Sequence, residues 1–201
     1  MTPIRFKPYI GKNYHHQDLK ILILGESHYL NENDFLDYKN EKERIELITH
    51  YVVNKYIEYK SNGKGFARWM NTFTKFGNVI HNKRMNNIET INFWEKCSFY
   101  NYVQFPTRKA RVSPTNEEFL KSKNAFETVI QQTKPDLVIF WGQRLWNNFP
   151  KENYKKGEIE TLKFNYSLPI LVLPHPSSSK FNYSLFDRIN DYIKLIKTQN
   201  N

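Results

Sequence analysis

Four stretches of the chain are rich in apolar or aromatic residues and stop abruptly at glycine, proline or polar residues. They cover residues 19–24, 97–105, 136–140 and 169–173, and Gly25 closes the first of them. Short apolar runs with such boundaries are typical of strands in a parallel sheet, because helices cover both faces of that kind of sheet. We therefore predict four buried strands.

Amphipathic helices are predicted between these strands, because apolar residues recur there at spacings of three and four. Glycines in residues 61–65 are suited to end one helix, and Thr115 with Glu118 has the pattern of a capping box that begins another. Residues 150–166 are charged and irregular, which predicts a surface excursion or a hairpin. The helices we expect cover residues 45–59, 66–77, 115–134, a segment through Leu145 and Trp146, and residues 181–196.

Strands that alternate with helices predict an α/β fold. We expect a three-layer α/β/α sandwich around a central, mostly parallel sheet of about four strands, joined by right-handed connections. The 201 residues are enough for one domain with a substantial core, so we expect a single domain over residues 1–201. In open α/β sheets ligands bind at the carboxyl ends of the strands. Polar residues that follow the strands are therefore the first candidates for a site.

The charge of the chain favours an anionic partner. Lys and Arg number 30 against 20 Asp and Glu, a formal net charge of +10, which favours an anionic partner such as nucleic acid over acidic proteins or neutral small molecules. The chain is also rich in Lys and Asn, and base composition or solubility is the alternative explanation of this bias. Basic residues with aromatics between them are concentrated in residues 64–84, where a surface that tracks phosphates and a solvated helix face explain them equally well. These basic residues are Lys64, Arg68, Lys75, Lys83 and Arg84.

A single cysteine, Cys97, excludes an internal disulfide framework and any all-cysteine metal or iron–sulfur site. The first residues lack the apolar core of a signal peptide, and no apolar run approaches the length of a membrane span. We expect a cytoplasmic monomer with no membrane association, no metal ion and no other cofactor. His15 and His16 are adjacent and would not face one point on regular structure, so we interpret them as solvent-exposed residues rather than ligands.

Three side chains with different chemistry fall at or near the ends of predicted strands. Glu26 follows Gly25 directly, Asn101 lies in the strand of residues 97–105, and His175 follows the last strand. Gly25 would allow a sharp turn and a close approach of a ligand to the backbone. We expect the carboxylate, the amide and the imidazole to converge on one crevice.

Four sequence motifs occur in an order that resembles the uracil-DNA glycosylase superfamily, over residues 19–179. The resemblance implies the α/β/α fold and hydrolysis of the N-glycosidic bond of uracil or a related damaged base in DNA. The motifs are Gly-Glu-Ser-His-Tyr at residues 25–29, Asn-Tyr-Val-Gln-Phe-Pro at 101–106 with Arg111 and Pro-Thr-Asn-Glu-Glu at 114–118 after it, Lys-Pro-Asp-Leu-Val-Ile-Phe-Trp-Gly at 134–142, and Leu-Pro-His-Pro-Ser at 173–177.

The chain departs from the family pattern in several places. His28 and Tyr29 replace the Pro-Gly of the Gly-Glu-Ala-Pro-Gly signature, and Ser27 stands at the position of the water-activating Asp in the classical Gly-Gln-Asp-Pro-Tyr-His motif. The cluster-binding cysteines of the iron–sulfur branches are absent, and no intercalating Leu follows the His-Pro-Ser motif. The resemblance therefore implies the fold more directly than it implies uracil specificity.

The resemblance also implies the catalytic residues. The reaction must stabilise an oxocarbenium-like sugar and a departing base, and it must position a water. Glu26 is the candidate that positions water or balances the cationic sugar. His28 is a further candidate for water activation, which the family pattern does not predict. His175 would form a hydrogen bond with the leaving oxygen of the base. A structural Glu26 bonded to loop amides and a structural His175 are the alternatives.

Other residues would bind the extruded base and the DNA backbone. Asn101 carries both a donor and an acceptor, which lets one side chain read the edge of a pyrimidine, and Tyr29 or Phe105 would stack on it. A buried asparagine that bridges backbone groups, and aromatic core residues, are the competing explanations. The candidates for phosphate binding are Ser27, Arg111, Ser177 and Ser178. The alternative is that these are exposed residues that only make the protein soluble.

Two other classes of function stay open. A non-catalytic member of the same fold would bind nucleic acid or nucleotides, and the altered first motif favours this alternative. A serine hydrolase is the other, because Ser27, Asp136 and His175 occur in Ser-acid-His order, although the second glycine of a Gly-x-Ser-x-Gly elbow is missing.

Overall fold

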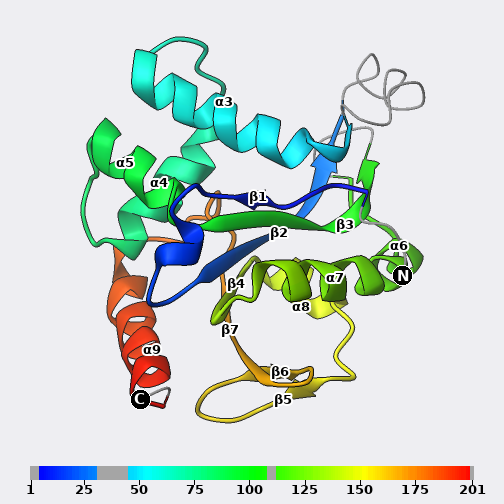
Figure 1. Ribbon diagram of the computed structural model, residues 1–201. Helices are drawn as coiled ribbons and strands as arrows, with labels where there is room; N and C mark the ends of the chain where they lie inside the picture. Colours follow the sequence, from blue (N-terminus) through cyan, green and yellow to red (C-terminus); the bar gives the residue numbers. More distant parts are fainter. Residues whose placement is uncertain (1–4, 31–44, 108–111, 200–201) are drawn as a thin grey trace.

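The computed structural model describes residues 5–30, 45–107 and 112–199. Arg111, one of the predicted phosphate contacts, lies outside the described residues. The described chain forms a sheet of seven strands (Figure 1). The strands are β1 (Tyr9–Ile10), β2 (Ile21–Tyr29), β3 (Ser98–Thr107), β4 (Leu137–Trp141), β5 (Tyr154–Lys155), β6 (Thr161–Lys163) and β7 (Ser167–Leu173).

Neighbouring strands are paired in the order β1-β3-β2-β4-β7-β6-β5. The pairs β3–β2, β2–β4 and β4–β7 are parallel, and the remaining three pairs are antiparallel. Helices combined with a partly parallel sheet confirm the predicted α/β class. The sheet has seven strands instead of the predicted four or so, because β1, β5 and β6 are too short to leave an apolar pattern in the sequence. For residues 150–166, the hairpin alternative is confirmed by the β5–β6 pair.

Helices cover both faces of the sheet. They are α3 (Ile48–Asn62), α4 (Met70–Ile80), α5 (Asn87–Trp94), α6 (Asn116–Lys121), α7 (Lys123–Thr133), α8 (Gln143–Asn148) and α9 (Phe186–Gln199), with the short 3-10 helices η1 (Tyr14–His16) and η2 (Tyr183–Leu185). Helices α3, α4, α5 and α9 pack on one face, and α6, α7 and α8 pack on the other (Figure 1).

Alternate residues of the central strands contribute to two apolar clusters on opposite faces. Ile23, Phe99 and Ile139 lie in the cluster beneath α3, α4, α5 and α9, whereas Leu22 and Phe140 lie in the cluster beneath α6, α7 and α8. The central strands are therefore buried on both sides. This double burial explains why their sequences are almost continuously apolar.

Local signals predicted several helix ends correctly. Gly63 ends α3 with a left-handed backbone (φ 72°), a conformation that glycine adopts without steric cost. Thr115 begins α6 with a capping box to Glu118. The helix predicted for residues 115–134 is interrupted at Ser122, whose hydroxyl donates to the Glu118 carbonyl at 2.7 Å.

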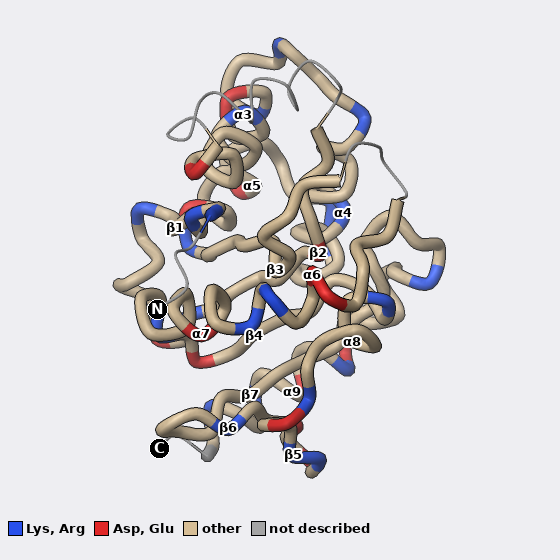
Figure 2. The backbone as a smooth tube through the Cα atoms, turned by 90° about the vertical axis from the view of Figure 1, so that its right-hand side faces the viewer, with Lys and Arg blue, Asp and Glu red and all other residues tan. Residues whose placement is uncertain are grey.

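Most charged residues lie on the helices and loops around the sheet (Figure 2). This distribution follows from the burial of the central strands on both faces, because an unpaired charge there would lose its hydration. Within the described residues, no helix combines the length and the apolar character needed to cross a membrane.

Candidate functional site

The carboxyl ends of four neighbouring strands lie along one edge of the sheet. Strands β3, β2, β4 and β7 are parallel and adjacent in that order. Asn101 belongs to β3, Glu26 to β2 and Trp141 to the end of β4, and His175 follows β7. At a spacing of about 4.8 Å between strands, the edge from β3 to β7 is about 14 Å long.

Asn101 lies beside Gly25 in the register of the β2–β3 pair. A β-carbon on residue 25 would stand 2.1 Å from Asn101 Oδ1, closer than two such atoms can approach. The amide side chain therefore uses the space that Gly25 leaves, and Asn101 is only 8% exposed. Position 25 favours a glycine because Asn101 comes close to the backbone there. From the sequence we instead expect a ligand close to this backbone.

His28 holds the amide of Asn101. Asn101 Nδ2 lies 3.2 Å from both ring nitrogens of His28, and His28 Nε2 lies 2.9 Å from the hydroxyl oxygen of Thr49 on α3. A neutral ring with its proton on Nε2 donates to Thr49 and accepts from Asn101 on Nδ1. Burial lowers the pKa of His28 to about 3, which keeps the ring neutral. His28 thus orients Asn101 in this structure, with both nitrogens engaged.

Glu26 is paired with Arg144 of α8, a residue that the sequence motifs did not single out. Arg144 Nε donates to Glu26 Oε2 at 2.8 Å and Nη2 donates to Glu26 Oε1, which makes a bidentate ion pair. Nη1 of the same guanidinium donates to Ser113 Oγ at 3.0 Å. The Glu26 side chain is 12% exposed, and its hydrogen bonds raise the pKa of Arg144.

His175 stands at the surface, and Ser177 fixes its ring. Nδ1 of His175 accepts the Ser177 backbone N–H at 3.2 Å and lies 2.7 Å from Ser177 Oγ. Because Nδ1 is an acceptor, the proton of the neutral ring lies on Nε2. Although the residue is exposed, one side of the ring packs at right angles against Trp141, with 6.2 Å between centroids. This partial loss of water, followed by the positive charge of Arg144, lowers the pKa of His175.

The predicted residues therefore form two clusters at one edge of the sheet. Asn101 and His28 face α3, where Thr49 completes their hydrogen bonds. Glu26 faces α8 on the other side of the sheet, where Arg144 binds its carboxylate. His175 packs against Trp141 and is near enough to Arg144 for the positive charge to contribute to its lowered pKa. The predicted convergence of Glu26, Asn101 and His175 on one crevice is therefore wrong. The three residues share an edge of the sheet, but Glu26 and Asn101 point to its opposite faces.

The loop after β7 is shaped by its own hydrogen bonds. The Ser178 N–H donates to the His175 carbonyl at 2.8 Å, and Ser178 Oγ accepts the Lys180 N–H at 3.2 Å. Lys75 of α4 donates to the Ser178 carbonyl at 2.7 Å. Two predicted phosphate contacts, Ser177 and Ser178, therefore shape the loop that carries the imidazole. Lys75, one of the basic residues of the region 64–84, joins the site from another element, and the sequence pattern did not predict this contact.

The other predicted residues lie around the same edge. Tyr29 is 53% exposed, so its ring faces solvent. Phe105 is half-buried, and the Arg5 guanidinium carbon lies 5.0 Å from the centroid of its ring. Ser27 is half-buried and lies opposite Val103 in the β2–β3 register. Of the two candidates for stacking, Tyr29 thus presents the more accessible ring.

The order Ser27, Asp136 and His175 does not correspond to a catalytic triad. Asp136 precedes β4, and its carboxylate accepts the Lys20 N–H at 2.8 Å at the amino end of the sheet. Ser27 and His175 lie at the carboxyl end. The five residues of β4 separate the two ends by about 17 Å. Asp136 therefore does not complete a triad with Ser27 and His175.

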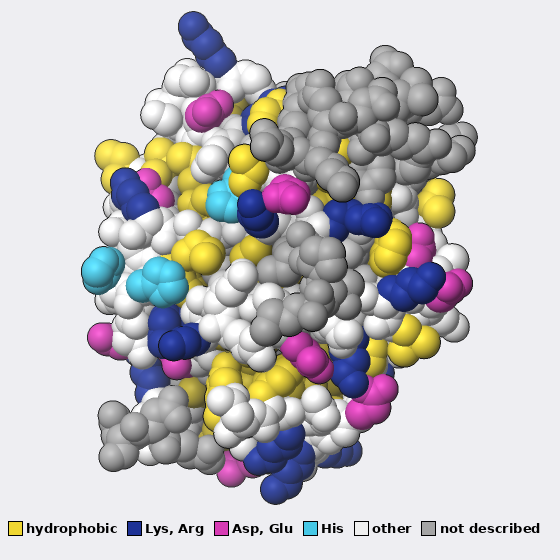
Figure 3. Space-filling view, turned by 45° about the vertical axis from the view of Figure 1, so that its right-hand side comes forward, with side chains coloured by type: hydrophobic (Ala, Val, Ile, Leu, Met, Phe, Trp, Pro, Cys, Tyr) yellow, Lys and Arg dark blue, Asp and Glu magenta, His cyan; other side chains and the backbone are white. Residues whose placement is uncertain are grey.

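Charge and cavities do not single out the strand ends. On the face drawn in Figure 3, Lys and Arg are interspersed with Asp and Glu. Within the described residues, no group of three or more His, Cys, Asp or Glu side chains is arranged to hold a metal ion. A hollow of about 580 Å³ lies between α3, α4 and the start of α5, and none of the predicted site residues lines it.

Comparison of the chain with family models and with curated proteins gave no match in either case. The resemblance to uracil-DNA glycosylases thus depends on the four sequence motifs alone. The candidate site is defined by these residues and by the contacts that Thr49, Lys75 and Arg144 add to them.

Proposed function

We propose that this chain is a DNA glycosylase of the uracil-DNA glycosylase type, which hydrolyses the N-glycosidic bond of uracil or a related damaged base. The proposal includes the three-layer fold, in which β3, β2, β4 and β7 form a parallel core between two layers of helices. The order of these strands is the observation that supports it most, because Asn101, the Glu26–Arg144 pair and His175 follow one another along a single edge. In this proposal the amide would read the base, the carboxylate would balance the cationic sugar, and the neutral hydrogen-bond donor would act on the departing base.

His175 would act on the departing base. Its Nδ1 accepts the Ser177 N–H, so Nε2 carries the proton, and its lowered pKa favours the neutral ring. A neutral imidazole donates a hydrogen bond to a carbonyl oxygen of the base as negative charge develops there. A donor of this kind contributes a factor of about 100 to 1,000 in rate.

Glu26 would stabilise the sugar and orient the water. When the bond between C1′ and the base nitrogen breaks, its electron pair leaves with the base and C1′ becomes electron-deficient. Water then adds its oxygen to C1′, and the proton it releases ends on the departing base. Both carboxylate oxygens of Glu26 already accept hydrogen bonds from Arg144. We therefore assign Glu26 to orientation and charge balance rather than to proton removal.

Asn101 would read the edge of the extruded base. Its Nδ2 donates to His28, which leaves Oδ1, above Gly25, as the acceptor for an N–H of a pyrimidine. A flipped amide would set its oxygen against the unprotonated nitrogen of His28. Because Thr49 fixes the imidazole in turn, the amide is held in one orientation before a base arrives.

Binding of nucleic acid without chemistry is the second candidate function. The Glu26–Arg144 pair favours it, because the pair engages the one carboxylate of residues 25–29. The net charge of +10 is compatible with both candidates, since either protein would bind a polyanion. The two differ in one observable property, the release of a free base.

The test is base release from oligonucleotides that contain uracil, hypoxanthine or a mismatched base, in single-stranded and double-stranded form, followed by alkaline cleavage at abasic sites. The wild type is expected to release at least one of these bases. His175→Ala should lower the rate about 100-fold or more. His16→Ala is the matched control, because it removes another exposed imidazole, from η1, and should leave the rate unchanged.

Three outcomes decide between the candidates. Equal rates for both histidine variants would remove His175 from the mechanism. Binding of the oligonucleotides by the wild type with no base release would favour the second candidate. Absence of both binding and release would refute both functions.

A further inference from the structure

A hollow of about 580 Å³ with both polar and apolar lining residues opens between α3, α4 and the loop that leads into α5. Its volume lies in the range of small-molecule sites. Neither the fold nor the candidate site explains it, since none of the strand-end residues takes part. Its polar lining residues are Lys60, Thr74, Asn78, Arg84, Asn86 and Asn87.

Among the described residues, the hollow is lined by two positively charged side chains and by no Asp or Glu. Lys60 and Arg84 are the charged residues among those that line it. In the part of the chain that the structure describes, neither forms an ion pair, and the Lys60 ammonium stands 5.6 Å from the ring centroids of both Tyr56 and Tyr59. Loss of water, followed by the charge of Arg84, lowers the pKa of Lys60. An anion between the two cations would relieve their repulsion.

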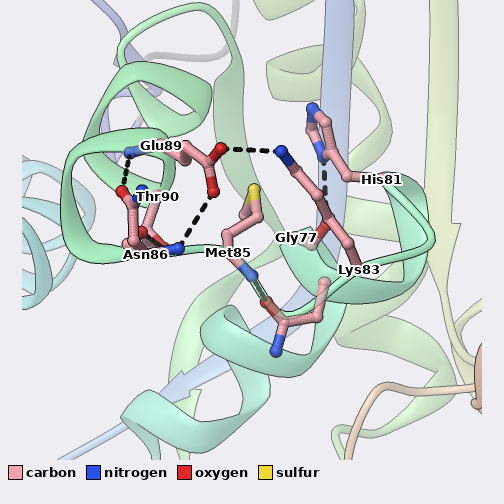
Figure 4. A network of polar contacts seen from close by, with 8 residues as sticks. Gly77, His81, Lys83, Met85, Asn86, Glu89 and Thr90 are labelled. Atoms are coloured by element: carbon pink, nitrogen blue, oxygen red, sulfur yellow. Dashed lines mark hydrogen bonds and ion pairs between the residues drawn. The ribbon is translucent and has the colours of Figure 1, made fainter.

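Glu89 in the first turn of α5 has both carboxylate oxygens engaged (Figure 4). Oε1 accepts a hydrogen bond from Lys83 Nζ at 2.6 Å, and Oε2 accepts the Asn86 N–H at 3.0 Å. Asn86 Oδ1 accepts the Glu89 N–H at 2.9 Å in return. Glu89 therefore neutralises the charge of Lys83 and caps α5. Arg84, which follows Lys83 in the sequence, lines the hollow and is not paired with Glu89.

The backbone on both sides of Arg84 is fixed. The Lys83 N–H donates to the Asn78 carbonyl at 3.0 Å, and the Met85 N–H donates to Asn78 Oδ1 at 2.9 Å. Met85 is buried against Gly77, where a β-carbon would come within 2.4 Å of its terminal methyl group. The loop is thus set before a ligand arrives, which lowers the entropy that binding costs.

We propose that this hollow binds a phosphate group through the charges of Lys60 and Arg84. The side-chain oxygens of Asn78 and Asn86 accept hydrogen bonds from Met85 and Glu89, so their NH₂ groups remain as donors toward the phosphate oxygens. A free nucleotide and the backbone of a nucleic acid strand both supply such a group. The inference does not depend on base excision at the strand ends.

The five basic residues of the region 64–84 differ in their contacts, and of these five only Arg84 lines the hollow. Lys75 binds the Ser178 carbonyl and Lys83 binds Glu89. Lys64 and Arg68 are exposed and do not line the hollow. The double variant Lys64→Gln/Arg68→Gln is therefore a matched control for Lys60→Gln/Arg84→Gln, because each removes one lysine and one arginine charge from neighbouring segments.

The experiment is a titration of the isotope-labelled full chain with sodium phosphate, with adenosine monophosphate and with a short oligothymidylate, followed by the backbone amide signals of residues 84–87. The wild type and the control should show saturable shifts with all three probes. Lys60→Gln/Arg84→Gln should weaken binding about tenfold or more, as expected for loss of charge-assisted hydrogen bonds. Well-dispersed amide spectra show that each variant is folded, and the single Arg84→Gln variant replaces the double one if it is not.

The probes distinguish the two sources of phosphate. Tighter binding of adenosine monophosphate than of sodium phosphate indicates a nucleotide, and tighter binding of the oligothymidylate, with a steep loss in salt, indicates a strand. Absence of saturable shifts in the wild type would overturn the proposal. Equal weakening in both double variants would also overturn it, because general charge would then explain the binding. Base release is not measured, so this result is independent of the proposed glycosylase.

Discussion

Asn101 and Gly25 face each other across the parallel pair β2–β3, and the amide oxygen of Asn101 lies where a β-carbon on residue 25 would stand. The glycine is therefore part of how the site is built, since any side chain there displaces the amide. His28 and Thr49 then hold the amide from the other side. This chain of contacts makes the position of Asn101 sensitive to residues that would not touch a substrate.

Gly25→Ala should destabilise the fold by about 1–3 kcal/mol, because the new methyl group overlaps Asn101 Oδ1 and the side chain must move. Urea unfolding measures the loss. In the Asn101→Ala background the same change should cost less, since the overlapping atom is gone, and a double-mutant cycle gives the coupling. An equal cost in both backgrounds would contradict the contact.

Arg144→Met should lower the free energy of unfolding by about 1–2 kcal/mol. The Glu26 carboxylate is largely buried and loses its bidentate partner, while the exposure of the guanidinium limits the effect. Arg188→Met, which removes an exposed arginine from α9, serves as the control in urea unfolding. Equal losses in the two variants would mean that the ion pair contributes little.

The same Arg144→Met variant should raise the pKa of His175. The guanidinium charge is one of the two causes that lower this pKa, and the partial loss of water beside Trp141 would remain. An NMR titration of the imidazole follows the change, with Arg188→Met again as the control. An unchanged pKa would show that Arg144 does not act on His175.

His28 should make the protein lose stability in acid. The folded-state pKa is about 3 against an ordinary value of 6.5, so the unfolded chain takes up a proton below pH 6.5 that the folded chain does not. Above pH 6.5 His28 is neutral in both states and does not change the free energy of unfolding with pH. Between pH 6.5 and pH 3 it lowers the free energy of unfolding by up to about 1.4 kcal/mol for each unit by which the pH falls. His28→Gln should reduce the slope of unfolding free energy against pH by the amount that corresponds to one bound proton. His16→Gln, which removes an exposed histidine, should leave the slope unchanged. Equal slopes for all three proteins would show that His28 is not buried in its neutral form.

Lys75→Met should lower the rate of base release about tenfold and alter the NMR titration of His175. The variant keeps the apolar stem but removes the donor to the Ser178 carbonyl, which holds the loop that carries the imidazole. A misplacement of this kind lowers the rate more than it lowers DNA binding. Lys64→Met is the control, because it removes an exposed lysine nearby. A changed binding constant with an unchanged rate would place Lys75 in DNA binding instead.

Much of the fold could be predicted, because the signals for its central elements are local. The apolar run at residues 136–140 corresponds to β4, and the capping pattern of Thr115 and Glu118 begins α6 as expected. The outer strands were not predicted, since two or three residues carry no period. The break at Ser122 was also missed, because it depends on a hydroxyl that serves both its own helix and the neighbouring Gln104 N–H.

Local patterns are sufficient to identify the buried strands, the amphipathic helices and the strand ends with chemically capable residues, because each pattern involves residues a few positions apart. The partners of those residues follow only from the folded arrangement. Glu26 and Arg144 are 118 residues apart, and His28 and Asn101 are 73 apart. Such contacts depend on which strands become neighbours and on which face each side chain takes. Those two choices are made when the sheet assembles against its helices, and no single segment of the chain records them.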